Sequence, residues 1–157
     1  VAAAALDKFV QMRETEGERL KADISSRAEA ILSKVALIEE RSPETVKAYR
    51  EKLENKIKEL LDDAKVDEQR LITETAIFAD KVAVDEETVR LRSHIKQLFS
   101  LLEENGPVGK KLDFIVQEMN RETNTIGSKC QDVDIAHVVV DIKSEIEKIR
   151  EQIQNIE

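Results

Sequence analysis

The sequence predicts an all-α protein, and two observations lead to that prediction. Only 3% of the 157 residues are aromatic, and the chain holds 4 Gly and 2 Pro, which leaves little room for turns or sheet. Apolar residues recur at steps of three and four along most of the chain, the period of an amphipathic helix. We therefore expect one elongated helical unit over 1–157, with a long helical hairpin, two short central helices and a C-terminal heptad-patterned helix.

The first 66 residues are expected to form the long helical hairpin. A helix from Ala2 to about Glu40 is indicated by an apolar stripe that runs from Leu20 to Ile38. Ser42-Pro43-Glu44 then offers an N-cap, a first-turn proline and an early acid, the signals of a new helix. The two helices are predicted to pack antiparallel.

Residues 67–157 are expected to form a helical core. A third helix is predicted from about Asp67 to Lys81, and Asp85 is predicted to cap a fourth that stops at Asn105-Gly106-Pro107. The fourth and fifth helices are predicted over 85–104 and 108–128, and the stretch 112–129 carries the unusual polar face described below. A last helix carries a heptad seam of isoleucine and valine: Ile135, Val139, Ile142, Ile146, Ile149, Ile153 and Ile156. This seam serves either association between chains or packing on the chain's own first helix.

Composition excludes several classes of protein. The net charge of -8 argues against general attraction to phosphate backbones, so any nucleic-acid site must be a local patch. Cys130 is the single cysteine, so no internal disulfide can form, and the apolar runs are too short for a membrane span. We expect a cytoplasmic protein without a membrane partner. The chain opens on alanines without an initiator Met, which suggests a piece of a longer protein.

The fifth predicted helix has an unusual polar face. Asn and Thr are poor helix formers, and a residue that weakens its own helix usually has a partner elsewhere. On a helical wheel, Leu112, Ile115, Val116, Met119 and Ile126 form the apolar stripe. One flank holds Asp113, Gln117, Asn120, Asn124 and Ser128, and a second row holds Glu118, Glu122, Thr125 and Lys129, with Arg121 between them.

Glu118 and Glu122 are four residues apart, so their carboxylates lie about one turn from each other. Two oxygen donors at this spacing suit a hard divalent cation or a general acid and base pair. A row of solvated acids is the ordinary alternative.

A second group lies in the fourth predicted helix, where Glu87, Arg90 and His94 form one ridge. His94 is interpreted as a general acid or base, as a metal ligand, or as a half-buried histidine bonded to Glu87. Basic residues near the ridge either contact phosphates or pair with acids: Lys81, Arg90, Arg92, Lys110, Lys111, Arg121 and Lys129. Phe114 projects between the polar flanks, where it stacks on a base or packs under another subunit.

Two long stretches of the chain are distinctive: VDEETVRLRSHIKQLFSLLEENGPVGKKLDFIVQEMNRETNTIGSKCQD and the ending SEIEKIREQIQNIE. With them, the chain closely resembles the C-terminal half of the bacterial YicC/YloC family of endoribonucleases. The resemblance implies a cytoplasmic, metal-dependent enzyme that cleaves single-stranded RNA internally and assembles as a hexamer around a channel. The N-terminal domain of that family is absent here, so the chain alone is expected to be inactive if that domain supplies RNA-binding or assembly surface.

The resemblance also assigns site residues, whose roles we infer. A divalent ion, Mn or Mg, is expected on Asp113, Glu118 and Glu122, with His94, Glu118 and Glu122 as the catalytic residues. Arg90, Lys111, Arg121 and Lys129 are expected to position phosphates. Gln117, Asn120 and Asn124 are expected to contact 2′-hydroxyls or base edges. The alternatives are a noncatalytic oligomerisation scaffold and an RNA-binding adaptor.

Overall fold

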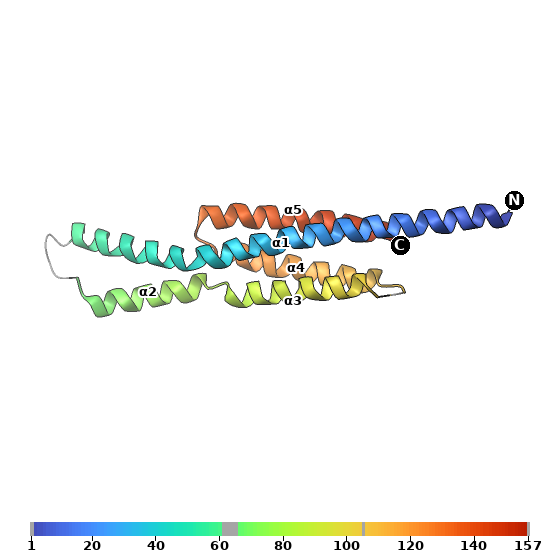
Figure 1. The fold of residues 1–157 in the computed structure, drawn as a ribbon. Coiled ribbons are helices and arrows are strands. Elements are labelled where there is room, and N and C mark those ends of the chain that lie inside the picture. The colour runs from blue at the N-terminus through green and yellow to red at the C-terminus, as the bar shows by residue number, and fades with distance from the viewer. Residues whose placement is uncertain (1, 61–65, 105, 157) are drawn as a thin grey trace.

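The computed structural model describes residues 2–60, 66–104 and 106–156, which fold into five α-helices. These are α1 (Ala2–Leu60), α2 (Glu68–Val82), α3 (Asp85–Leu102), α4 (Gly109–Lys129) and α5 (Val133–Ile156). The described residues contain no strand, and the molecule is elongated along α1 (Figure 1). The predicted all-α, elongated fold is confirmed.

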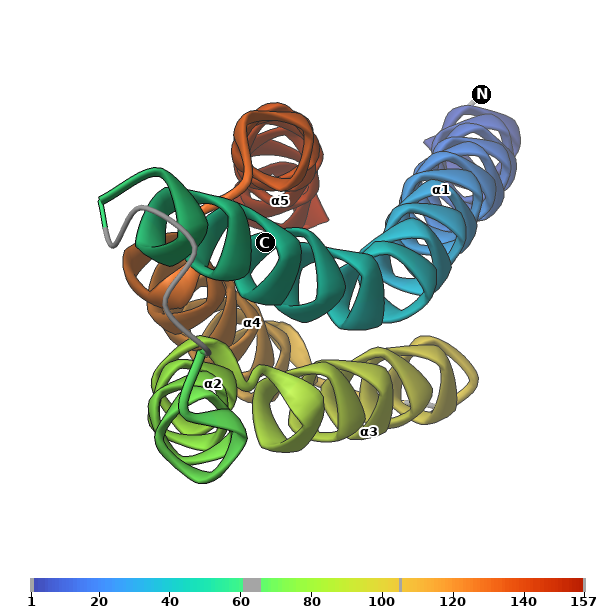
Figure 2. The ribbon, with the colours of Figure 1, turned by 90° about the vertical axis from the view of Figure 1, so that its left-hand side faces the viewer.

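The core lies where α3, α4 and α5 pack beside α1. α4 packs against both α3 and α5, and α1 contacts α3 and α5, so these helices enclose one apolar core (Figures 1 and 2). Fully buried residues from every helix of this bundle meet there, including Ile31 of α1, Leu98 of α3, Met119 of α4 and Ile142 of α5. None of the helices within the described ranges combines the length and the apolar character needed to cross a membrane.

Proline 43 lies inside α1, so the predicted helix break at Ser42-Pro43 is wrong. A proline inside a helix removes one backbone hydrogen bond and bends the helix, but tertiary contacts on both sides can hold the two halves together. Here the carboxylate of Asp132 accepts from Arg41 at 3.0 Å and from Thr45 at 3.2 Å, one on each side of Pro43. α1 changes direction partway along its length (Figure 2).

The long hairpin is therefore formed by other segments than the two predicted ones. The C-terminal part of α1 and α2 lie side by side and run in opposite directions (Figure 1). The rings of Tyr49 and Phe78 stack between them, with centroids 3.8 Å apart. Asp67 caps α2, because its side chain accepts a hydrogen bond from the backbone N–H of Arg70 at 3.2 Å. Residues 61–65 lie outside the described residues.

The boundaries of α3 and α4 differ from the predicted ranges by at most two residues. Asp85 is the first residue of α3 and not its cap, since Val84 occupies the cap position without a side-chain hydrogen bond. The negative charge of Asp85 in the first turn still favours the helix through its dipole. α3 ends at Leu102, and of the predicted stop signal Asn105 lies outside the described residues while Gly106 adopts a φ of 126°, which glycine tolerates. α4 runs from Gly109 to Lys129, so each end lies within one residue of the predicted range 108–128.

The heptad seam of α5 packs inside the chain. Its members from Ile135 to Ile153 are at most 5% exposed, and α5 packs against α1 and α4. Of the two interpretations of the seam, packing on the chain's own first helix is confirmed, with α4 as a second partner. The side chain of Ile156 lies outside the described residues.

Candidate functional site

The second polar row of α4 faces α3. On the wheel this row was either a functional pair of acids or a solvated row, yet Glu122 is only 6% exposed and Glu118 is partly buried. The facing ridge of α3 contains Glu87, which is 3% exposed, and His94. Two helices that pack along a polar ridge and a polar row enclose charged groups between them, which is unusual for a helix interface.

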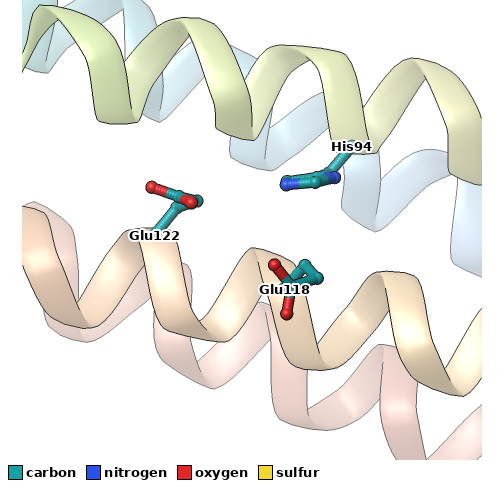
Figure 3. Close-up of side chains that lie close together, drawn as sticks. All are labelled: His94, Glu118 and Glu122. Carbon is teal, nitrogen blue, oxygen red and sulfur yellow. The ribbon is translucent and has the colours of Figure 1, made fainter.

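His94, Glu118 and Glu122 come together at this interface. One ligand atom of each lies within 4.8 Å of the others (Figure 3). The histidine extends from α3 and the two glutamates extend from α4 toward it. We call these three residues the trio. The i, i+4 spacing in the sequence indicated the glutamate pair, and the structure adds the imidazole from the facing helix.

Glu87 pairs with the side chains of Lys129 and Arg90 and forms no hydrogen bond with His94. Its Oε1 accepts from Lys129 Nζ at 2.8 Å and lies 3.3 Å from Arg90, whereas the buried Nδ1 of His94 has no hydrogen-bond partner among the described residues. The interpretation of His94 as a histidine bonded to Glu87 is therefore wrong. Burial raises the pKa of Glu87, but the hydrogen bond from Lys129 and the nearby charges outweigh it and hold the pKa below its ordinary value.

Arg90 joins Glu87 to the trio. Its Nε lies 3.0 Å from Glu122 Oε1, and its terminal nitrogens reach Glu86 and Glu87. The hydrogen bond to Glu122 raises the pKa of Arg90, so the guanidinium stays charged. Lys129 also donates to the backbone oxygen of Ala83 at 3.1 Å. Arg90 and Lys129 thus neutralise carboxylates at the interface, which fixes the orientation of Glu122.

The other predicted phosphate-binding residues lie outside this network. Lys111 pairs with Glu104 at 3.1 Å. The side chain of Arg121 is 76% exposed and lies 3.9 Å from Glu118. Arg121 is therefore the predicted phosphate ligand whose charge is most accessible from solvent next to the trio.

Asp113 is not brought to the trio. Its carboxylate accepts a hydrogen bond from Gln117 at 2.7 Å and lies 4.0 Å from Arg150 of α5. It points toward the α5 side of α4, whereas Glu118 and Glu122 face α3. A metal ion held by the trio would therefore not include Asp113 in the arrangement observed here.

The outward face of α4 is exposed along its whole length. It carries Phe114, Gln117, Asn120, Arg121, Asn124 and Ser128. The hydroxyl of Ser128 donates to a backbone oxygen of its own helix at 2.8 Å, which satisfies it locally. The side chains of Asn120 and Asn124 make no hydrogen bond within the described part of the chain. Their amides are therefore available to a ligand.

Two residues of α3 beside the trio were not singled out from the sequence. Lys96 and Gln97 line a groove of about 780 Å³ that also borders Lys110 and Phe114 of α4. Gln97 follows His94 by three residues, so the ridge that begins at Glu87 could have been extended to it. No sequence pattern indicates Lys96, because only the packing of α3 on α4 brings it to the same groove as Lys110 and Phe114.

Comparison with known proteins identifies the family to which the chain is related. Residues 38–157 match the family described as "Endoribonuclease YicC-like, C-terminal". A Clostridioides difficile protein named "Probable endoribonuclease YicC" is 52% identical over 154 residues, which are 98% of this chain and 53% of that protein. A Haemophilus influenzae protein of the same name is 38% identical over 152 residues, which are 97% of this chain and 52% of that protein.

The chain therefore spans about half the length of the curated relatives it matches. The family match covers most of the chain, including α3, α4 and α5 in full. By this match the chain belongs to the YicC-like endoribonuclease family and corresponds to its C-terminal domain.

Proposed function

We propose that this chain carries the divalent-metal site of an endoribonuclease that cleaves single-stranded RNA. The names of its relatives support RNA cleavage in general. The observation that carries the location of the site is the convergence of His94, Glu118 and Glu122 within 4.8 Å at the α3–α4 interface. A buried imidazole nitrogen without a hydrogen-bond partner, next to two carboxylates, is a combination that active sites often contain.

The donor set of the trio fits a divalent cation. Ligands of one ion with bonds of about 2.2 Å lie no more than about 4.4 Å apart, so small side-chain movements would suffice. The buried Nδ1 of His94 has no partner, and Arg90 occupies one oxygen of Glu122 and leaves the other. Two carboxylates with one imidazole suit Mn²⁺ better than Mg²⁺, which prefers oxygen ligands and water.

Each residue of the trio then has a role that its position supports. His94, Glu118 and Glu122 would hold the ion, which when bound supplies positive charge next to a phosphate and acidifies water. Arg90 fixes the carboxylate of Glu122 from the side through its 3.0 Å contact. If His94 is not a ligand, its imidazole is placed to accept or donate a proton near the carboxylates.

The exposed face of α4 supports binding of an RNA strand beside the trio. Arg121 presents a guanidinium to solvent one turn from Glu118, where it can contact a phosphate. The free amides of Asn120 and Asn124 and the side chain of Gln117 offer donors and acceptors for 2′-hydroxyls or base edges. The hexameric assembly and the cytoplasmic location implied by the family are part of the same proposal.

The test is cleavage of a fluorescent single-stranded RNA as a function of Mn²⁺ concentration. It uses the form of the protein that has the full length of its relatives, with Glu118→Gln, His94→Gln and Glu147→Gln, the last an exposed α5 control. We expect Glu118→Gln to raise the Mn²⁺ concentration needed by at least roughly tenfold. We expect His94→Gln to slow cleavage by about 100-fold to 10,000-fold, and the control to behave as the unchanged protein.

Two outcomes would reject this proposal. Unchanged rate and Mn²⁺ dependence in Glu118→Gln would remove the trio from the chemistry. RNA binding that needs no divalent ion, without cleavage by any form, would favour the RNA-binding adaptor. Melting curves of each variant separate loss of the site from loss of the fold.

A further inference from the structure

The groove on the α3–α4 edge begins about one helical turn from His94 and Glu118. Gln97 lies one turn beyond His94 on α3, and Phe114 lies one turn before Glu118 on α4, so the groove starts about 5.4 Å along the helices from the trio. Its volume of about 780 Å³ is within the range of small-ligand sites, roughly 300–1,000 Å³. A polymer that passes the trio along this edge would therefore enter the groove.

Phe114 gives the groove an aromatic wall, and its ring has no aromatic or cation–π partner among the described residues. Phe114 is 59% exposed, whereas the next residue, Ile115 of the apolar stripe, is 6% exposed. Leu101 and Ile115 form the apolar floor beside it. An exposed ring over an apolar floor fits a flat unsaturated group, which can lie on the ring face while its edge stays in water.

The rim of the groove is positively charged, although the whole chain is acidic. Lys96 stands on α3, and Lys110 and Lys111 stand on the first turn of α4. Within the described ranges, neither Lys96 nor Lys110 has an acidic partner in salt-bridge distance, while Lys111 pairs with Glu104, the one acid that lines the groove. In a chain of net charge -8, two free ammonium groups around an aromatic ring indicate an anionic ligand with a flat ring.

We propose that this groove binds one nucleotide of a single-stranded RNA, with its base stacked on Phe114 and its phosphate between Lys96 and Lys110. The inference rests on the proposed function. If one phosphate of the strand lies at the trio, the groove holds the neighbouring nucleotide. A base inside a duplex has both of its faces covered by the adjacent bases. Stacking on Phe114 therefore requires an unpaired base, which a single strand provides. Stacking on Phe114 requires a base but hardly distinguishes between bases, since every base has a face that can stack.

The test measures RNA binding without cleavage. Fluorescence anisotropy in EDTA compares an unstructured oligoribonucleotide with an abasic strand of the same length, which keeps the phosphates and lacks the bases. The variants are Phe114→Ala, Phe114→Trp and the double variant Lys96→Ala with Lys110→Ala. Phe9→Ala is the matched control, because Phe9 is 50% exposed on α1 and does not line the groove.

We expect Phe114→Ala to weaken binding of the base-containing strand roughly tenfold and to leave the abasic strand unaffected. Phe114→Trp should restore the affinity, and Phe9→Ala should leave it unchanged. The double lysine variant should weaken both strands and lower the slope of log K against log salt by about 0.7 for each lost phosphate contact.

An equal effect of Phe114→Ala on both strands, or no effect on either, would overturn the inference and leave the groove to a protein partner. Because EDTA removes any ion from the trio, these measurements do not depend on catalysis. Failure of Glu118→Gln to alter cleavage would reject the catalytic proposal while a base-specific loss in Phe114→Ala would still place a nucleotide in the groove. The two proposals can thus fail separately.

Discussion

Two helix interfaces of this chain bury side chains of opposite character, one apolar and one charged. The seam of α5 packs isoleucine and valine against α1 and α4, and its described members are at most 5% exposed. The α3–α4 edge instead buries Glu87 and Glu122, with Arg90 and Lys129 beside them. The seam stabilises the fold by removing apolar surface from water, whereas each charge taken into the α3–α4 edge must be compensated.

Under the proposed function, the seam serves stability and the α3–α4 edge serves chemistry. Glu87 Oε2 and His94 Nδ1 are buried without a hydrogen-bond partner in the described part of the molecule. Buried polar atoms without partners destabilise a fold, and a ligand at this edge, as proposed above, would give them partners. A well-packed apolar seam nearby supplies the stability that such an edge lacks.

The largest effect on stability is expected at the seam. Ile142→Ala removes a fully buried side chain, so we expect the free energy of unfolding to fall by about 2–5 kcal/mol. Urea denaturation followed by circular dichroism measures this change. Val140→Ala on the same helix is the control, because Val140 is 63% exposed and its replacement should change stability by less than about 0.5 kcal/mol. Equal losses in both variants would mean that the seam is not the core.

A smaller loss is expected at the polar edge. Lys129→Met removes the bonds to Glu87 and to the backbone oxygen of Ala83, and we expect a loss of about 1–3 kcal/mol. Adding Glu87→Leu to this variant removes the stranded carboxylate and should recover most of the loss. The same urea titration compares the two variants. A double variant less stable than Lys129→Met would show that the buried pair itself stabilises the fold.

Acid should weaken the polar edge before the seam. The folded pKa of Glu87 is lower than its ordinary value, so the unfolded chain binds the proton more readily. The stabilisation from Glu87 is therefore present above its unfolded pKa, about 4.3, and is lost as pH falls through the folded pKa. The measurement is the free energy of unfolding against pH. Glu87→Gln should lose less stability between pH 6 and pH 3 than the unchanged chain, and parallel curves would contradict this.

The smallest effect is expected at the exposed margin of the seam. Lys34 of α1 pairs with Asp141 of α5 at 3.3 Å, and the Asp141 side chain is largely exposed. Surface pairs of this kind contribute about 0–1 kcal/mol, so Lys34→Ala should hardly change the urea midpoint. A loss above about 1 kcal/mol would mean that charge, and not only isoleucine packing, joins α1 to α5.

The repeating apolar positions predicted the helices and the seam well, but single-residue signals misplaced their ends. Pro43 looked like a helix start because proline is common there, yet α1 runs through it, with Asp132 bonded to residues on both sides. Asp85 looked like a cap and is instead the first helical residue. Local signals of this kind are overridden when distant segments provide partners, which a single stretch of sequence does not reveal.

The candidate site was predictable only in part. The spacing of Glu118 and Glu122 predicted that their carboxylates share one side of a helix, and His94 was recognised as a candidate on another helix. The spacing could not reveal that the polar row of α4 faces the ridge of α3. Nor could it reveal that Arg90 pairs with Glu122 or that Asp113 points away toward Arg150. These contacts depend on the rotation of α3 relative to α4, to which residues on both helices and on α1 contribute.

The sequence by itself determined that this protein is helical, where its apolar stripes lie and which residue types share a helix face, because these properties follow from a period of 3.6 residues within one segment. The tertiary structure alone decided which face is buried, which acids are paired with cations and which three side chains converge. The physical reason is that burial and ion pairing are relations between segments, set by the packing of the whole core.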